Sequence, residues 1–542
     1  MLTNVLNKVY NRKDIRLPAN GIVLRKVYYS TFYKGETLVE SVAKQYIEHL
    51  LTYAHKHGLI HAMDITLSRN LILDLLKINS PWNEQNNATD TLPPTDIDTI
   101  LAPILDYACD MGFIEQNTTT QRDLFEGKIF AHLTPRQSEI ETTFKNIHNT
   151  QGIECATDYF YNLSKATNYI KTNRIKKDLY WKHPTPYGDI EITINLSKPE
   201  KDPRDIAAQK EKEQSQYPKC LLCIENVGYA GHINHPPRQN HRILPITLGG
   251  EQWFFQYSPY SYYNEHCIPL NAAHIPIKIS QSTFVKLFDF LEIMPHYFIG
   301  SNSDLPISGG SILSHDHFQG GKHRFALDRA KPTKTFKIGA VQASILNWPM
   351  SVIRLNGEKN DLIQTATNIL SSWGSYNNQP LEIISHTQNT PHNTITPIAR
   401  LNKNSYELDL VLRNNRTNNE HPLGIFHPHS HLHHIKKENI GLIEVMGLAI
   451  LPGRLKKEIS IIEDILNDKC CATQAPDHHK QWVTELAMEM TNKDTCPDDV
   501  IKTSIGNKFV EVLCNAGVFK QDQQGQNAFE DFVKQSGGVP CK

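Results

Sequence analysis

The sequence predicts an α+β fold in which a mainly helical N-terminal region precedes a strand-rich remainder. Apolar residues recur at helical spacing within residues 1–175, and a strand with strict alternation follows over 190–196. Helices and strands then come in blocks, without the regular alternation of strand and helix that is typical of α/β proteins. These two observations predict the fold class.

The helical prediction rests on two apolar segments. Apolar side chains between Val39 and Ala54 repeat at helical spacing, and Gly58 offers a C-cap beyond them. Residues 67–78 predict a second helix. Residues 82–98 are polar and contain prolines, so we expect a loop there.

The strand-rich part begins after a Tyr-Gly-Asp turn at 187–189. Four aliphatic side chains alternate with polar ones over 190–196, which predicts a half-buried strand. Further expected elements are extended segments at 252–263 and 407–413, a helix through 284–291, and a long helix beginning near Glu438.

Size and composition restrict the function. A chain of 542 residues with 39% apolar residues should form two to four structural units. Its 56 basic and 57 acidic residues provide no basic field for nucleic acid. We expect neither a signal peptide nor a membrane span, and ten cysteines are too sparse for a disulfide scaffold, so we expect a cytoplasmic protein. Neither common phosphate-binding glycine motif is present.

The densest chemical motif is SGGSILSHDHFQGG at 308–321. In extended structure, period two places His315, His317 and Gln319 on one face. The preceding Gly309, Gly310 and Ser311 would let backbone N–H groups approach an anion closely. The alternative is a solvated edge strand that carries His-x-His by chance.

An imidazole suits phosphoryl-type transfer because the neutral ring is nucleophilic and its phosphoramidate is labile. The amide of Gln319 can donate a hydrogen bond to a phosphoryl oxygen without changing its protonation state. A histidine at that position could act as an acid and assist hydrolysis.

Two further motifs suggest metal binding. Cys220 and Cys223 have metal-chelating spacing, although redox pairs share it, and His274 and His315 are candidate partners for a zinc ion. His274 also fits an ordinary loop histidine. In the tract HPHSHLHH at 427–434, alternate histidines would share a face in extended structure and could hold a second metal, although such tracts are often solvated loops.

Several longer segments resemble the galactose-1-phosphate uridylyltransferase family of the Gram-positive, class II type. They are NVGYAGHINHPPRQN at 226–240, YSPYSYYNEHC at 257–267, PHYFIGSN at 295–302 and KKENIGLIEVMG at 436–447. The resemblance covers most of the chain. It implies two tandem halves of the histidine-triad superfamily with antiparallel sheets, at 176–330 and 331–542, after the helical region 1–175.

The resemblance also implies an activity and its site residues. UDP-glucose would give its uridylyl group to a histidine, and galactose 1-phosphate would take it, with glucose 1-phosphate and UDP-galactose as products. Class I relatives carry His-Pro-His-x-Gln, so the nucleophile falls on His317 and the phosphoryl-contacting amide on Gln319, while Asp316 replaces the proline. The zinc ligands of class I fall on Cys220, Cys223, His274 and His315.

The remaining family positions concern substrate contacts and assembly. Class I places a substrate-binding asparagine at the position of Asn302, and phosphate-contacting arginines where Lys198, Lys201 and Arg204 stand. The 427–434 tract is the counterpart of a second, iron-type site, and class I relatives suggest a homodimer. Two alternatives are another histidine-triad nucleotidyltransferase, such as a dinucleoside polyphosphate phosphorylase, and a non-catalytic nucleotide or metal sensor.

Overall fold

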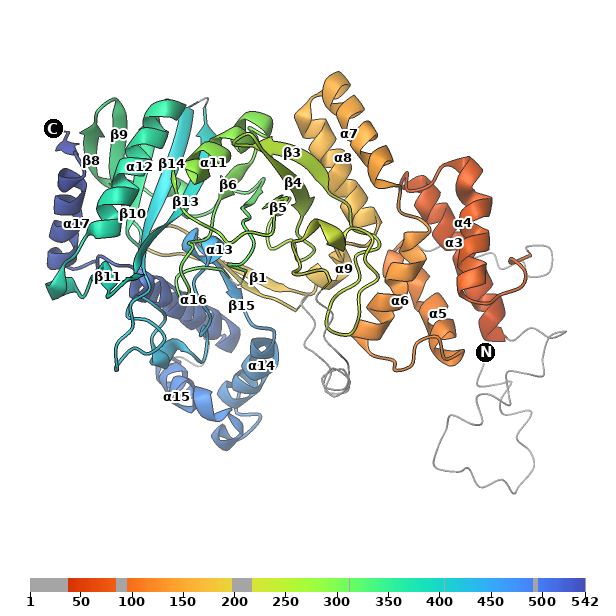
Figure 1. The fold of residues 1–542 in the computed structure, drawn as a ribbon. Helices are drawn as coiled ribbons and strands as arrows, with labels where there is room; N and C mark the ends of the chain where they lie inside the picture. Colours follow the sequence, from red (N-terminus) through yellow and green to blue (C-terminus); the bar gives the residue numbers. More distant parts are fainter. Residues whose placement is uncertain are drawn as a thin grey trace. The chain divides into compact units, whose positions relative to one another are not determined.

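The structure is a computed structural model that describes residues 38–83, 95–196, 217–310, 312–403, 405–490 and 496–541. The chain divides into two compact units, Met1–Leu133 and Thr134–Lys542. Each unit is drawn in Figure 1. None of the described helices is both long and apolar enough to cross a membrane.

The first unit is helical in its described part, which confirms the prediction for this region. Its helices are α3 (Leu38–Lys56), α4 (Ile65–Leu75), α5 (Ile97–Asp110) and α6 (Thr119–Ala131). The apolar stripe of α3, which includes Ile47 and Leu50, is buried. Gly58 follows with a φ of 68°, a left-handed conformation that favours glycine and ends the helix.

The second unit begins with three helices and a small sheet. The helices are α7 (Gln137–Gln151), α8 (Ile153–Ala166) and α9 (Thr172–Ile175). In the three-stranded sheet, β2 (Ile190–Ile194) lies between β1 (Leu179–His183), which is antiparallel to it, and β15 (Leu448–Leu451), which is parallel.

The prediction that β2 is half-buried is wrong, because every one of its residues is buried. Its polar side chains are covered rather than solvated. Glu191 accepts hydrogen bonds from the Tyr180 hydroxyl at 3.0 Å and from Nε2 of His323 at 3.1 Å. These two donors compensate the carboxylate for its loss of water, so the alternating pattern does not mark an exposed face.

An antiparallel sheet of eleven strands forms the centre of the second unit (Figure 1). Its order is β16-β8-β9-β10-β14-β13-β6-β7-β5-β4-β3. The strands are β3 (Leu244–Leu248), β4 (Glu251–Tyr257), β5 (Cys267–Asn271), β6 (Phe298–Gly300), β7 (Gln319–Gly321), β8 (Pro332–Ile338), β9 (Val341–Leu346), β10 (Val352–Gly357), β13 (Asn393–Asn402), β14 (Ser405–Asn414) and β16 (Val539–Pro540). A separate hairpin joins β11 (His386–Thr387) to β12 (Thr390–Pro391).

Strands from both predicted halves join in this one sheet. The junction is the antiparallel pair of β6 and β13, with Ile299 opposite Ala399. Helices α11 (Gln281–Ile293) and α12 (Lys359–Ser375) contact each other and the sheet. The α+β class predicted from the sequence is confirmed.

The long helix expected from Glu438 does not form. The chain instead makes a short helix, α13 (Leu442–Val445), then strand β15, and only then α14 (Arg454–Leu466). Gly447 has a φ of 99°, which interrupts helical geometry, and the following residues pair with β2. The apolar run therefore serves three elements in succession.

The C-terminal helices complete the unit. They are α15 (Lys480–Glu489), α16 (Pro497–Ala516) and α17 (Gln523–Gln535). Helices α14, α15 and α16 pack together, and Trp482 and Phe509 lie in the buried core that they share with the small sheet.

Candidate active site and metal centre

The two cysteines of the Cys-x₂-Cys motif lie in a turn that precedes a short 3₁₀ helix, Ile224–Asn226. The buried side chain of Asn226 shapes this turn, because its Nδ2 donates to the carbonyl oxygens of Cys220 and Cys223 at 2.8 Å each. The turn thereby directs both sulfur atoms to one side. The two sulfur atoms are therefore placed to bind one metal ion together, as the spacing of the cysteines in the sequence indicated.

His274 and His315 complete a four-residue cluster with these cysteines. All four potential ligand atoms lie within 4.8 Å of one another. The Sγ atoms are 3.5 Å apart, Cys220 Sγ lies 3.2 Å from Nδ1 of His315, and Cys223 Sγ lies 3.1 Å from Nδ1 of His274. The structure brings together the four residues that the sequence nominated.

The cluster fits a tetrahedral zinc ion by donor type and by spacing. Zinc bonds of about 2.3 Å to sulfur and about 2.0 Å to nitrogen place ligand atoms roughly 3.5 Å apart around a tetrahedron. The nitrogen of His315 that faces away from the sulfurs, Nε2, lies 2.8 Å from the carbonyl oxygen of Asn271 and must donate to it. This bond leaves Nδ1 as the lone-pair atom, as a metal ligand requires.

The segment around His317 is held against β5. His317 forms an isolated bridge with Leu270, and the Phe318 amide donates to the carbonyl of Pro269 at 2.8 Å. Phe318 stacks on Trp253 with ring centroids 4.7 Å apart. Asp316 lies 3.9 Å from Lys286, which itself sits over the ring of Trp253. Asp316 and Phe318 therefore share one side, as the alternation predicted.

His317 is buried and has a defined tautomer. Only 6% of its surface is exposed, and its Nδ1 lies 2.7 Å from the carbonyl oxygen of His315. A carbonyl oxygen can only accept, so Nδ1 carries the hydrogen and Nε2 is the lone-pair nitrogen of the neutral ring. Burial lowers the pKa of His317 to about 4, so the ring is neutral at physiological pH.

Gln319 meets a histidine that the sequence reasoning did not single out. Nε2 of His266 lies 3.2 Å from Oε1 of Gln319. Burial lowers the pKa of His266 to about 3, so this ring is neutral too. Its Nδ1 is buried without a hydrogen-bond partner. The single ring hydrogen therefore belongs on Nε2, where it is donated to Gln319, since a buried N–H without an acceptor costs more than a bare lone pair.

The His266 bond orients the amide of Gln319. With Oε1 taken by His266, the NH₂ group is the part of the amide that remains to act as a donor. His266 is itself held by the ring of Tyr263, with centroids 4.5 Å apart. Its place in the family-like segment 257–267 is the only sequence feature that could have drawn attention to it.

The glycine-containing loop is tightly packed on itself. A Cβ on Gly310 would collide with the side-chain amide of Asn302, and one on Gly309 would collide with the carbonyl oxygen of Ser303. The Oδ1 atom of Asn302 accepts from the amide of Leu442 at 2.8 Å and so ties the loop to α13. Ser311, Lys198, Lys201 and Arg204 lie outside the described residues.

The expectation that alternate histidines of the 427–434 tract share a face is wrong. Residues Ser430–Leu432 form a 3₁₀ helix, so the segment is not extended. Both ring nitrogens of His427 are engaged, by the Pro428 carbonyl and by Asn439. Within the described chain, no cluster of three potential metal ligands includes a histidine of this tract.

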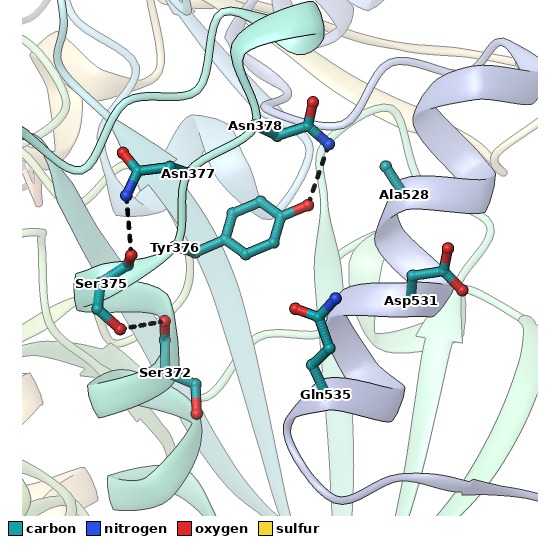
Figure 2. Close-up of a pocket in the computed structure, with 8 residues that line it drawn as sticks. All are labelled: Ser372, Ser375, Tyr376, Asn377, Asn378, Ala528, Asp531 and Gln535. Carbon is teal, nitrogen blue, oxygen red and sulfur yellow. Dashed lines mark hydrogen bonds between the residues drawn. The ribbon is translucent and has the colours of Figure 1, made fainter.

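A surface pocket lies elsewhere in the second unit, between the C-terminal end of α12 and α17 (Figure 2). Asn378 donates to the Tyr376 hydroxyl at 3.2 Å within it. The lining is polar but includes neither histidine nor cysteine, so this pocket contains no imidazole or thiolate side chain that could act as a nucleophile. Its residues are Ser372, Ser375, Tyr376, Asn377, Asn378, Ala528, Asp531 and Gln535.

The site therefore contains a buried neutral histidine, an amide oriented by a hydrogen bond and a Cys₂His₂ cluster, which are groups that can support group transfer. Comparisons with known proteins make the class specific. The family description "Galactose-1-phosphate uridyl transferase, N-terminal domain" matches residues 60–276, and "Galactose-1-phosphate uridyl transferase, C-terminal domain" matches residues 290–484. The chain belongs to the galactose-1-phosphate uridylyltransferase family.

Relatives named galactose-1-phosphate uridylyltransferase match over nearly their whole length. The protein of Caldanaerobacter subterraneus subsp. tengcongensis is 51% identical, over 92% of this chain and 99% of its own. That of Bacillus subtilis is 48% identical, over 92% of this chain and 98% of its own. That of Streptococcus pneumoniae is 48% identical, over 78% of this chain and 86% of its own. A comparison with solved structures found no match.

Proposed function

We propose that the protein transfers the uridylyl group of UDP-glucose to galactose 1-phosphate by a ping-pong mechanism, with His317 as the covalent nucleophile. The names of relatives about half identical to this chain support the substrates. The single observation that supports the nucleophile is the hydrogen bond from Nδ1 of His317 to the His315 carbonyl, which makes Nε2 the reactive nitrogen.

In the first half-reaction, the Nε2 lone pair of His317 attacks the α-phosphorus of UDP-glucose. A P–N bond forms, and the bond from that phosphorus to the bridging oxygen breaks, so glucose 1-phosphate leaves with the bonding electrons. In the second half-reaction, a phosphate oxygen of galactose 1-phosphate attacks the same phosphorus. The P–N bond breaks, UDP-galactose leaves, and the imidazole is restored to its neutral form.

Gln319 stabilises the transferring group in both half-reactions. Its NH₂ group donates to a non-bridging oxygen of the uridylyl phosphoryl, where negative charge accumulates in the transition state. His266 holds the amide in the required orientation through Oε1. His266 is therefore a positioning residue, because it acts through Gln319 and not on the substrate.

The Cys₂His₂ cluster would hold one structural zinc ion, with Cys220, Cys223, His274 and His315 as ligands. Such an ion, when bound, supplies a rigid cross-link. His315 then fixes the backbone whose carbonyl receives the Nδ1 hydrogen of His317. A reduced cysteine pair fits a cytoplasmic protein.

The remaining assignments concern substrate contacts and assembly. Backbone groups of Gly309, Gly310 and Ser311 would contact phosphate oxygens, with Asn302 supporting the loop. Lys198 and Arg204 would contribute positive charge for the sugar phosphates. The proposed assembly is a homodimer, as in class I relatives.

Isotope exchange tests the ping-pong mechanism directly. The full-length protein is incubated with UDP-glucose and labelled glucose 1-phosphate in the absence of galactose 1-phosphate. Label should enter UDP-glucose, because a uridylyl-enzyme forms and reverses without the second sugar. Normal overall transfer without any exchange would overturn the covalent intermediate and favour direct displacement between the two bound substrates.

A further inference from the structure

A second cluster of potential metal ligands lies in the C-terminal helices, on elements that the proposed reaction does not use. It comprises Glu458 on α14 and two adjacent histidines, His478 and His479, in a 3₁₀ turn (Asp477–His479) that leads into α15. The three potential ligand atoms lie within 4.8 Å of one another. Packing of α14 against α15 brings the two elements together.

The carboxylate of Glu458 faces both imidazoles. Its Oε1 lies 3.3 Å from Nε2 of His478, and its Oε2 lies 3.0 Å from Nε2 of His479. His479 is fully buried, whereas the side chain of His478 is 48% exposed. The cluster therefore has a fixed inner ligand and an outer ligand that solvent can reach.

The far side of His479 is also held. Its Nδ1 lies 2.9 Å from Nδ1 of His434, which belongs to the histidine tract that the reaction does not use. Both rings pack against Trp482, with centroids 5.2 Å away. A histidine whose outer nitrogen is fixed by a second group presents its other nitrogen in one orientation, as metal-binding histidines usually do.

The guanidinium of Arg454 lies beside two of the three potential ligands. Nη1 of Arg454 lies 2.6 Å from Oε2 of Glu458 and 3.4 Å from Nε2 of His478. A guanidinium only donates, so Nε2 of His478 accepts from Arg454 in the tautomer that carries the ring hydrogen on Nδ1. The Arg454 side chain is 37% exposed, and its Nη2 also donates to the carbonyl oxygen of His434 at 3.2 Å. The site thus already holds a positive group against its carboxylate, in the place that a metal ion would take.

We propose that Glu458, His478 and His479 bind one divalent transition-metal ion, for which Zn²⁺ is the natural candidate, with Arg454 as the competing cation. Two imidazoles and a carboxylate suit Zn²⁺ and its first-row neighbours, and three protein ligands leave one position for water. The bound ion would join α14 to the start of α15. This proposal is independent of the uridylyl-transfer reaction.

Titration of the metal-stripped, reduced full-length protein with Co²⁺ tests the proposal. Co²⁺ at a thiolate site shows intense sulfur-to-metal absorption, whereas a site of nitrogen and oxygen ligands shows only weak bands. The intense absorption therefore measures the Co²⁺ bound to the Cys₂His₂ cluster separately from the Co²⁺ bound elsewhere. The wild-type protein should bind a second equivalent without added thiolate absorption. His478→Ala should lose that equivalent and keep the first, and its exposed position makes unfolding of the variant implausible as a cause.

Two further variants sharpen the result. Arg454→Gln should bind the second equivalent at least about tenfold more tightly, because a competing positive charge is removed. His431→Ala is the matched control, since this histidine is exposed and pairs with Glu511 outside the cluster. It should bind both equivalents as the wild type does. The proposal would be overturned if the wild type bound no second equivalent, if His478→Ala bound it as the wild type does, or if only the control lost it. Glu458, His478 and His479 would then be a hydrogen-bonded cluster without a metal.

Discussion

Two histidine-rich segments of this chain look alike in sequence, but among the described residues only one of them contributes a histidine to a cluster of potential metal ligands. In residues 315–319, each histidine donates from one ring nitrogen to a backbone carbonyl, which leaves the other nitrogen as the lone-pair atom. In residues 427–434, His429 and His433 also bond to backbone carbonyls, but His431 and His434 use a ring nitrogen for distant side chains, those of Glu511 and His479. The groups that packing places around each ring decide what a histidine can do, so the density of histidines alone does not define a site.

The largest expected effect is the loss of His317. His317→Ala should lower UDP-glucose/glucose 1-phosphate exchange by more than about 10⁴-fold, because no other group replaces a covalent nucleophile. Exchange of label is the measurement, with His431→Ala as the control from the other segment. His317→Gly should regain turnover with added imidazole. A His317→Ala enzyme that exchanges at the wild-type rate would show that the nucleophile is another residue.

Gln319→Ala should produce the next largest effect. Loss of one donor to the transferring phosphoryl should slow both half-reactions by about 10²–10³-fold, with little change in the KM for galactose 1-phosphate. Single-turnover rates for each half-reaction provide the measurement. A change confined to KM would show that the amide binds ground-state substrate and does not stabilise the transition state.

Cys220→Ser tests whether the metal cluster supports the reactive segment. We expect zinc content to fall by about one per chain, the melting temperature to drop by at least about 5 °C, and turnover to fall about tenfold, because metal binding contributes folding free energy and holds His315. Elemental analysis and thermal melting are measured together. Cys471→Ser is the matched control, since that thiol is exposed. A metal-free protein with unchanged melting and full activity would exclude the site.

The smallest expected effect tests whether His266 acts only by positioning Gln319. His266→Phe keeps a ring beside Tyr263 but removes the bond to Gln319, so kcat should fall by up to about tenfold with KM unchanged. In a double-variant cycle with Gln319→Ala, the second substitution should cost almost nothing, because both act through one amide. Fully additive losses would show that His266 acts independently of Gln319.

Local sequence patterns predicted much of the fold. The stripe from Val39 to Ala54 became α3, and the segment through Phe284 and Leu291 became α11, because helical periodicity directly reports one buried face. The pattern failed at Glu438, where one apolar run serves α13, β15 and α14 in turn. A run of residues that are all buried shows no apolar periodicity, so its sequence cannot indicate where a helix or strand ends.

The residues of the two candidate sites also divide into those that local sequence spacing predicted and those that only the fold brings together. Short-range spacing was enough to nominate Cys220 with Cys223, and His315, His317 and Gln319 as one extended run, because neighbours in sequence have few ways to be arranged. The pairing of His266 with Gln319 spans 53 residues, and that of His434 with His479 spans 45.

The sequence by itself therefore determined the class of fold, through its periodic apolar segments, and the close spacing of Cys220 with Cys223 and of the side chains in 315–319, through backbone geometry over a few residues. Only the tertiary structure decided which nitrogen of each histidine carries the hydrogen and which polar groups meet across the fold. Those choices depend on the carbonyl, amide or carboxylate that packing places opposite each ring, and no local pattern encodes that partner.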